Sequence, residues 1–105
     1  MNFEVVKENL THQDIIQLIR HFFPGFNDYI ETDSYLILPT ICHNLNIDEA
    51  SKKLYYYDNT KLFFCYTHCD SSFDIFDLIQ KMLKLRDLPA ELGDVFRIKW
   101  FCRES

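Results

Sequence analysis

Glycine and proline are scarce in this sequence, with two glycines and three prolines among 105 residues. No glycine-rich phosphate motif is present, which argues against a loop that cradles a nucleotide. There is also no HExxH motif and no Ser-His-Asp arrangement that would indicate a catalytic centre. No apolar run approaches the roughly 18 residues of a membrane-spanning helix. The sequence therefore predicts a non-catalytic domain without a membrane partner.

Basic side chains are scarce in the first half of the chain. Residues 1–50 carry two basic and eight acidic side chains, whereas residues 51–105 carry nine basic and eight acidic ones. The formal net charge is −5. We expect any contact with a polyanion such as nucleic acid to lie in the second half. The acidic half is then expected to face something else, such as a protein partner.

An export signal is also lacking, because residues 1–10 are too short and too charged for an apolar export core. We therefore expect a cytoplasmic protein, in a bacterial cell or a phage-infected host. Disulfides are rare there, and clustered cysteines more often bind metal. The length suits one domain, residues 1–105, with one compact core.

Hydrophobic spacing predicts two helices. The first covers residues 12–23, begins with the capping pair Thr11 and Asp14, and ends at the Pro-Gly that follows. In the second, Ser71 with Asp74 repeats the capping pattern before another apolar face. The apolar face of the second helix consists of Ile75, Phe76, Leu78, Ile79, Met82, Leu83 and Leu85.

Aromatic residues are abundant, at 16% of the chain, and they mark the predicted strands. Two runs rich in β-favouring residues surround Asp58-Asn59-Thr60, which predicts a β-hairpin. The runs of the hairpin are Leu54–Tyr57 and Leu62–Cys65. The remaining expectations are a loop over 26–34, a strand over 35–38, an irregular loop over 40–52, a turn or helical stub over 88–93 and a strand over 94–101.

Four cysteines raise the question of a metal site. Cys65 and Cys69 lie on a turn that leads into the second helix, and soft ligands two to four residues apart form half of a structural zinc site. Cys42 and His43 can supply the other half, although adjacent side chains diverge in an extended chain. His68 is the rival fourth ligand. The alternative is that the cysteines are small apolar core residues. The fourth cysteine, near the C-terminus, is expected to play no part.

The order of these motifs resembles the zinc-binding domain of DnaG-type DNA primases, in the divergent versions of phages and mobile elements. The matching features are His43-Asn44, the hairpin 53–65, the turn 65–69 and Ile75-Phe76-Asp77-Leu78. The resemblance covers roughly residues 38–85, and we place a zinc-ribbon-like core at about 35–85. It implies a zinc ribbon followed by the second helix after the Cys turn. Together with the N-terminal helix, which lies outside the resemblance, we expect an α+β fold.

The same resemblance implies a function. The primase domain holds Zn²⁺ and contacts the single-stranded DNA template, while primer synthesis resides in a separate domain that is absent here. We therefore expect a replication accessory that binds single-stranded DNA or a primase, polymerase or helicase partner. The alternative is a small acidic protein-interaction module, an accessory or inhibitor protein, that reuses the ribbon to bind a protein.

The hairpin supplies the predicted binding surface. Side chains alternate between the two faces of a strand, so Leu54 and Tyr56 are expected to face the core and Tyr55 and Tyr57 to face outward. Exposed aromatic rings beside cations hold single-stranded nucleic acid by base stacking and phosphate contacts. The alternative is that the rings cover the core and the cations are solvated. The residues assigned to nucleic-acid binding are Lys52, Lys53, Tyr55, Tyr57, Lys61 and Tyr66.

Overall fold

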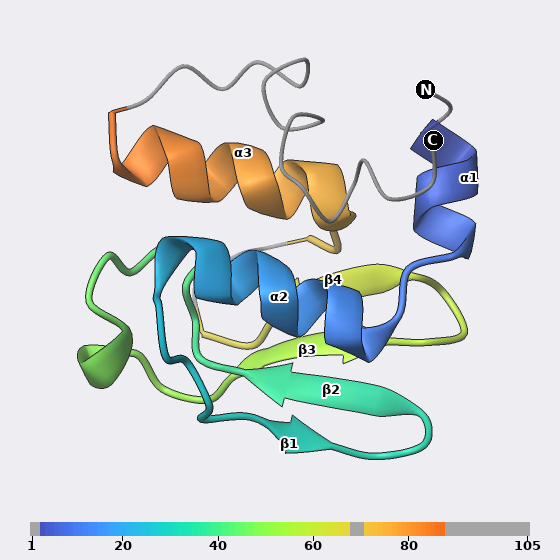
Figure 1. The fold of residues 1–105 in the computed structure, drawn as a ribbon, viewed down its shortest axis with the longest axis horizontal. Helices are drawn as coiled ribbons and strands as arrows, with labels where there is room; N and C mark the ends of the chain where they lie inside the picture. The colour runs from blue at the N-terminus through green and yellow to red at the C-terminus, as the bar shows by residue number, and fades with distance from the viewer. Residues whose placement is uncertain (1–2, 68–70, 88–105) are drawn as a thin grey trace.

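A computed structural model describes residues 3–67 and 71–87 of the chain. The elements, in order, are α1 (Phe3–Glu8), α2 (His12–Phe22), β1 (Ile30–Glu31), β2 (Tyr35–Leu38), the 3₁₀ helix η1 (Ile47–Glu49), β3 (Leu54–Tyr57), β4 (Leu62–Cys65) and α3 (Ile75–Leu85). The strands form one antiparallel sheet in the order β1-β2-β3-β4, with helices before and after it (Figure 1). The predicted α+β class is confirmed, and the arrangement is compatible with a small ribbon-like domain.

Helix α2 begins at the predicted cap. The Thr11 hydroxyl accepts a hydrogen bond from the Asp14 amide, and the Asp14 carboxylate accepts one from the Thr11 amide. This capping box satisfies two amides that lack partners within the helix. The helix ends at Phe22, one residue before the predicted end, and Gly25 then adopts a φ of +86°, which favours glycine.

Helix α3 begins three residues later than the predicted cap at Ser71 implies. Asp74 is the cap: its carboxylate accepts from the Asp77 amide, and the Asp77 carboxylate accepts from the Asp74 amide. The prediction of Ser71 as the cap was therefore wrong. The physical reason lies at Phe73, whose amide and carbonyl both bond to Phe63 in an antiparallel bridge that keeps this segment extended.

The β-hairpin is confirmed with its predicted strands. Leu54 pairs with Cys65 and Tyr57 with Leu62, and residues 58–61 form the turn, one residue longer than predicted. Two loop predictions need correction. Residues 26–34 contain β1, which pairs with β2, and residues 40–52 contain η1.

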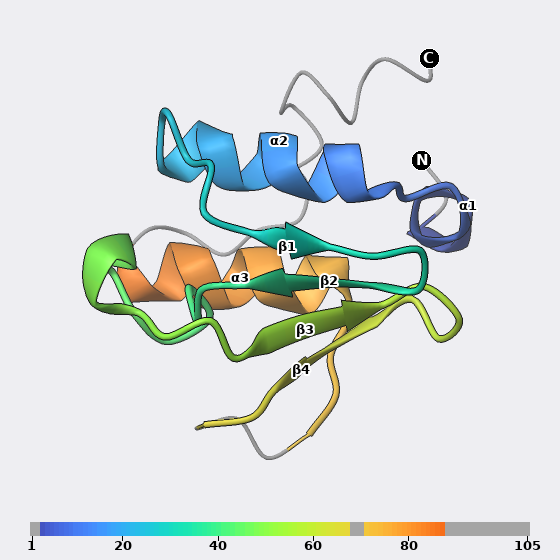
Figure 2. The ribbon, with the colours of Figure 1, turned by 90° about the horizontal axis from the view of Figure 1, so that it is seen from below.

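Helices α2 and α3 lie on the same side of the sheet (Figure 2). The buried faces of β2, β3 and β4 meet the buried faces of these helices in one core. The Arg86 guanidinium stacks over the Phe22 and Phe23 rings and so joins the ends of α3 and α2. The buried side chains that the sheet contributes to the core are Leu36, Leu38, Leu54, Tyr56, Phe63 and Cys65.

The predicted stub over 88–93 and strand over 94–101 lie outside the described residues. Among the described residues, no helix combines the length and the apolar character needed to cross a membrane.

Candidate metal centre and aromatic face

Three predicted metal ligands meet at one end of the sheet. In the antiparallel order, the end of β2 and the end of β4 lie on either side of the start of β3. Cys65 is the last residue of β4, and Cys42 and His43 follow β2 by a few residues. One ligand atom from each of Cys42, His43 and Cys65 lies within 4.8 Å of the other two. This group can bind a metal ion.

A turn after β2 brings the adjacent residues Cys42 and His43 to the same site. The Ile41 amide donates to the Pro39 carbonyl at 2.7 Å, and the His43 amide donates to the Thr40 carbonyl at 3.3 Å. The backbone is therefore folded rather than extended at this point. Side chains that would diverge in an extended chain instead converge on Cys65.

Neighbouring polar groups orient the ligands. Thr67 Oγ1 lies 3.2 Å from His43 Nε2 and 3.4 Å from Cys65 Sγ, so these two ligand atoms face the same point. On the other side of the ring, Asn44 Nδ2 lies 3.1 Å from His43 Nδ1 and also donates to the Thr40 carbonyl. These contacts hold the His43 ring between Thr67 and Asn44.

The donor set fits a small thiophilic cation. Two thiolates bound to Zn²⁺ at about 2.3 Å in a tetrahedron lie about 3.8 Å apart, so a group within 4.8 Å needs only a small closure. Cys42 and Cys65 are buried, which suits a closed structural site. The predicted ligand Cys69 and its neighbour His68 lie outside the described residues.

The sheet face opposite the helices carries the predicted tyrosines. Burial alternates along β2, β3 and β4, and the inward positions Leu54 and Tyr56 are fully buried, which confirms their predicted orientation. The outward positions are half-buried, and Tyr66 is exposed. We call this surface the aromatic face; it consists of Tyr35, Ile37, Tyr55, Tyr57, Leu62, Phe64 and Tyr66.

Ring contacts connect the tyrosines of the aromatic face. Tyr55 and Tyr57 stack with ring centroids 6.0 Å apart, and Tyr35 lies 5.9 Å from Tyr55. Tyr66 meets Tyr55 edge-on at 4.9 Å, and its hydroxyl hydrogen-bonds the Tyr57 hydroxyl. That hydrogen bond, followed by burial, raises the pKa of Tyr57 to about 12. The rings therefore form one connected surface of neutral side chains.

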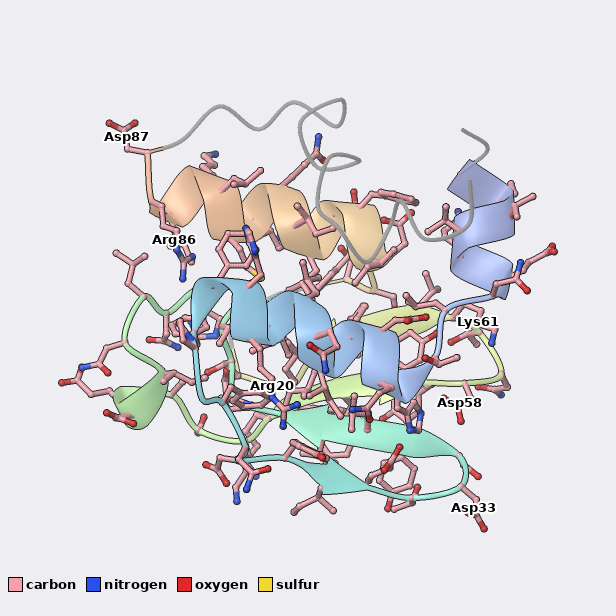
Figure 3. The ribbon with its side chains drawn as sticks, viewed as in Figure 1. Arg20, Asp33, Asp58, Lys61, Arg86 and Asp87 are labelled. Carbon is pink, nitrogen blue, oxygen red and sulfur yellow. The ribbon has the colours of Figure 1, made fainter. Side chains whose placement is uncertain are left out.

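The three predicted lysines lie at different places around the aromatic face. Lys53 is exposed, and its carbonyl accepts a hydrogen bond from the Tyr66 amide. Lys52 forms an ion pair with Asp28 at 3.0 Å. Lys61 lies at the β3–β4 turn with Asp58, near the start of α2 (Figure 3). It lines a depression there of about 470 Å³. Lys53 is thus the lysine that lies beside Tyr66.

Some residues that contribute to the two sites are not among the predicted ones. Tyr35 and Phe64 join the aromatic face, and Thr67 joins the metal group. The alternating pattern of the strands was a usable signal for Tyr35 and Phe64. The position of Thr67 depends on the path of the chain after β4, which no local pattern indicates.

A further cluster joins His12 to Glu31 and Asp58 by hydrogen bonds at the start of α2.

The chain is similar to a protein of prophage origin. The chain is 39% identical over 74 residues to the SPbeta prophage-derived uncharacterized protein YorJ of Bacillus subtilis (strain 168). The aligned region covers 70% of this chain and 19% of that protein, so the chain spans about a fifth of the length of its relative. No protein family and no solved structure matches the chain. The chain is therefore similar to part of a prophage-derived protein.

Proposed function

We propose that the group formed by Cys42, His43 and Cys65 binds Zn²⁺, with Cys69 as a further ligand. The support is the convergence of two buried thiols and a partly buried imidazole at one point, since sulfur and nitrogen are the donors that structural zinc sites use. His68 remains the alternative to His43. Bound zinc would join the end of β2 to the end of β4 and stabilise the folded chain.

Elemental analysis tests the zinc proposal directly. Protein purified without chelator is expected to contain about one zinc per chain, because four N and S ligands make a closed site. Cys65→Ser should lose the metal and destabilise the fold, because metal binding and folding are coupled in small zinc domains. Cys102→Ser is the matched control and should keep the metal. A wild-type protein with only a small fraction of one zinc per chain would contradict the proposal.

We further propose that the domain is a non-catalytic part of a phage or mobile-element replication system and binds single-stranded DNA on the aromatic face. The observation that carries this proposal is the connected set of rings of Tyr35, Tyr55, Tyr57 and Tyr66. An antiparallel sheet that covers a core on one side normally has a polar outer face. An apolar outer face is typical of an interaction surface, and aromatic rings stack with bases of any sequence.

Titration with fluorescently labelled oligothymidylate at several salt concentrations tests this proposal. We expect binding at low salt with a shallow salt dependence, because Lys53 is the only one of the three predicted lysines that lies beside Tyr66 and is not in an ion pair. A duplex of the same length should bind more weakly, because its bases are stacked on each other. No binding to single strands at low salt would contradict the proposal.

The second candidate function is binding to a replication protein such as a primase, polymerase or helicase. One observation favours it: every side chain of the aromatic face is uncharged, and the protein as a whole is acidic. A protein partner can cover such a face by apolar contact alone. If oligothymidylate does not bind while the partner does, and Tyr55→Ala weakens the partner complex, this second function is the correct one.

A further inference from the structure

The segment from Cys65 to Thr67 contacts both candidate sites. Cys65 Sγ is one of the three candidate metal ligands, and Thr67 Oγ1 contacts both Cys65 Sγ and His43 Nε2. Tyr66, between them, points to the other side of the sheet and packs on Tyr55. Three consecutive residues therefore lie alternately in the metal group and on the aromatic face.

Tyr66 is held on the aromatic face by several contacts. Its ring meets Tyr55 at 4.9 Å and Phe64 at 4.7 Å, and its hydroxyl bonds to that of Tyr57. Its amide donates to the Lys53 carbonyl at 2.9 Å, which continues the β3–β4 ladder by one step beyond Cys65. These contacts fix the backbone on both sides of the Tyr66 residue.

We infer that Tyr66 is a positioning residue that couples metal binding at Cys65 to the aromatic face. With Tyr66 packed on Tyr55 and Tyr57, the flanking Cys65 and Thr67 are held in the geometry that faces His43. When Tyr66 leaves the face, that geometry is lost. The metal thus stabilises the packed arrangement of the aromatic face, and the inference rests on the proposed zinc site and the proposed binding of single strands.

Coupling between two sites is reciprocal. If zinc favours the packed position of Tyr66, a ligand that stacks on the packed face must raise the affinity for zinc by the same factor. Oligothymidylate is therefore expected to tighten zinc binding in the wild-type protein, and zinc to tighten oligothymidylate binding. Neither effect requires contact between the metal and the nucleic acid.

Zinc affinity, measured by competition with a chromophoric chelator, tests the role of Tyr66. Tyr66→Ala is expected to lower zinc affinity by roughly 2-fold to 10-fold, the range that one aromatic pair contributes. Tyr66→Phe keeps the ring contacts and should restore most of the affinity. Tyr35→Ala is the matched control, because Tyr35 packs on Tyr55 and Tyr57 from β2, away from the metal group. It should leave zinc affinity unchanged.

The same measurement with oligothymidylate separates coupling from a general structural effect. Oligothymidylate should raise the zinc affinity of the wild type and not that of Tyr66→Ala. Equal zinc affinity in wild type and Tyr66→Ala, or an equal loss in Tyr35→Ala, overturns the inference. If single strands bind the wild type equally well with and without zinc, the coupling fails while the proposed function stands. If they bind in neither condition, the proposed function fails with it.

Discussion

Tyr56 is the inward-facing tyrosine of β3, and its hydroxyl is buried. Among the described residues the hydroxyl has no hydrogen-bond partner. A buried hydroxyl without a partner costs about 1–3 kcal/mol relative to a hydrated one. The ring itself fills the core beside Phe63, with ring centroids 4.8 Å apart. The aromatic ring of Tyr56 therefore stabilises the fold, whereas its hydroxyl does not.

Tyr56→Phe keeps the ring and removes the hydroxyl. We expect the free energy of unfolding to stay constant or to rise by up to about 1–3 kcal/mol, measured by urea denaturation. Tyr56→Leu, which removes the ring contact with Phe63, should lower it and serves as the comparison. A clear loss of stability in Tyr56→Phe would show that the hydroxyl has a partner.

Alkaline pH should destabilise the protein through ionisation of Tyr56. Burial, with a smaller contribution from Asp58, raises the pKa of Tyr56 from 10.0 to about 12. The folded state thus keeps a proton that the unfolded state loses first. The resulting stability is fully present below pH 10 and is lost as the pH rises toward 12.

Urea denaturation at pH values between 9 and 12 measures this loss. Tyr56→Phe should lose less stability than the wild type over the range, and the remaining loss includes Tyr57, whose pKa is also raised to about 12. A wild-type free energy of unfolding that does not fall above pH 10 would contradict the assignment.

At the scale of elements, two overlapping capping patterns precede α3, and the helix begins after only one of them. Ser71 with Asp74 and Asp74 with Asp77 both have the spacing of a capping box, and the structure uses the second. The bridge between Phe63 and Phe73 decides between them, because it keeps the residue before Asp74 extended. Local sequence cannot reveal a bridge to a strand ten residues away.

Substitution of the cap tests this assignment. Asp74→Ala should lower the free energy of unfolding by about 0.5–2 kcal/mol, because the Asp77 amide loses its acceptor. Ser71→Ala is the control and should change stability little. Thermal denaturation compares the two variants. A larger loss in Ser71→Ala than in Asp74→Ala would place the cap at Ser71 after all.

Elements with strong local signals were predictable and those fixed by tertiary contacts were not. Helix α2 has its capping box and apolar face within one segment, and the β3–β4 hairpin has two aromatic runs around a tight turn. By contrast, β1 has two residues and exists through its pairing with β2. The convergence of Cys42 and His43 on Cys65 depends on the turn at Thr40, which only the folded chain shows.

At the scale of the whole molecule, the two faces of the sheet differ in what their side chains contact. One face packs under α2 and α3 and forms the core (Figure 2). The other carries uncharged aromatic and aliphatic side chains, although the chain has a net charge of −5. The metal group lies at one end of the sheet and joins the strand ends that border the aromatic face. This division supports the proposed binding domain and its proposed stabilisation by a metal ion.

The most direct test of this account is the affinity of Tyr55→Ala for single-stranded oligothymidylate. Tyr55 lies at the centre of the aromatic face, so we expect a loss of about 1–3 kcal/mol in binding free energy from a variant that still folds. Val5→Ala, which truncates an exposed apolar side chain on α1, is the control and should bind like the wild type. Unchanged binding by Tyr55→Ala, or its unfolding, would contradict the account.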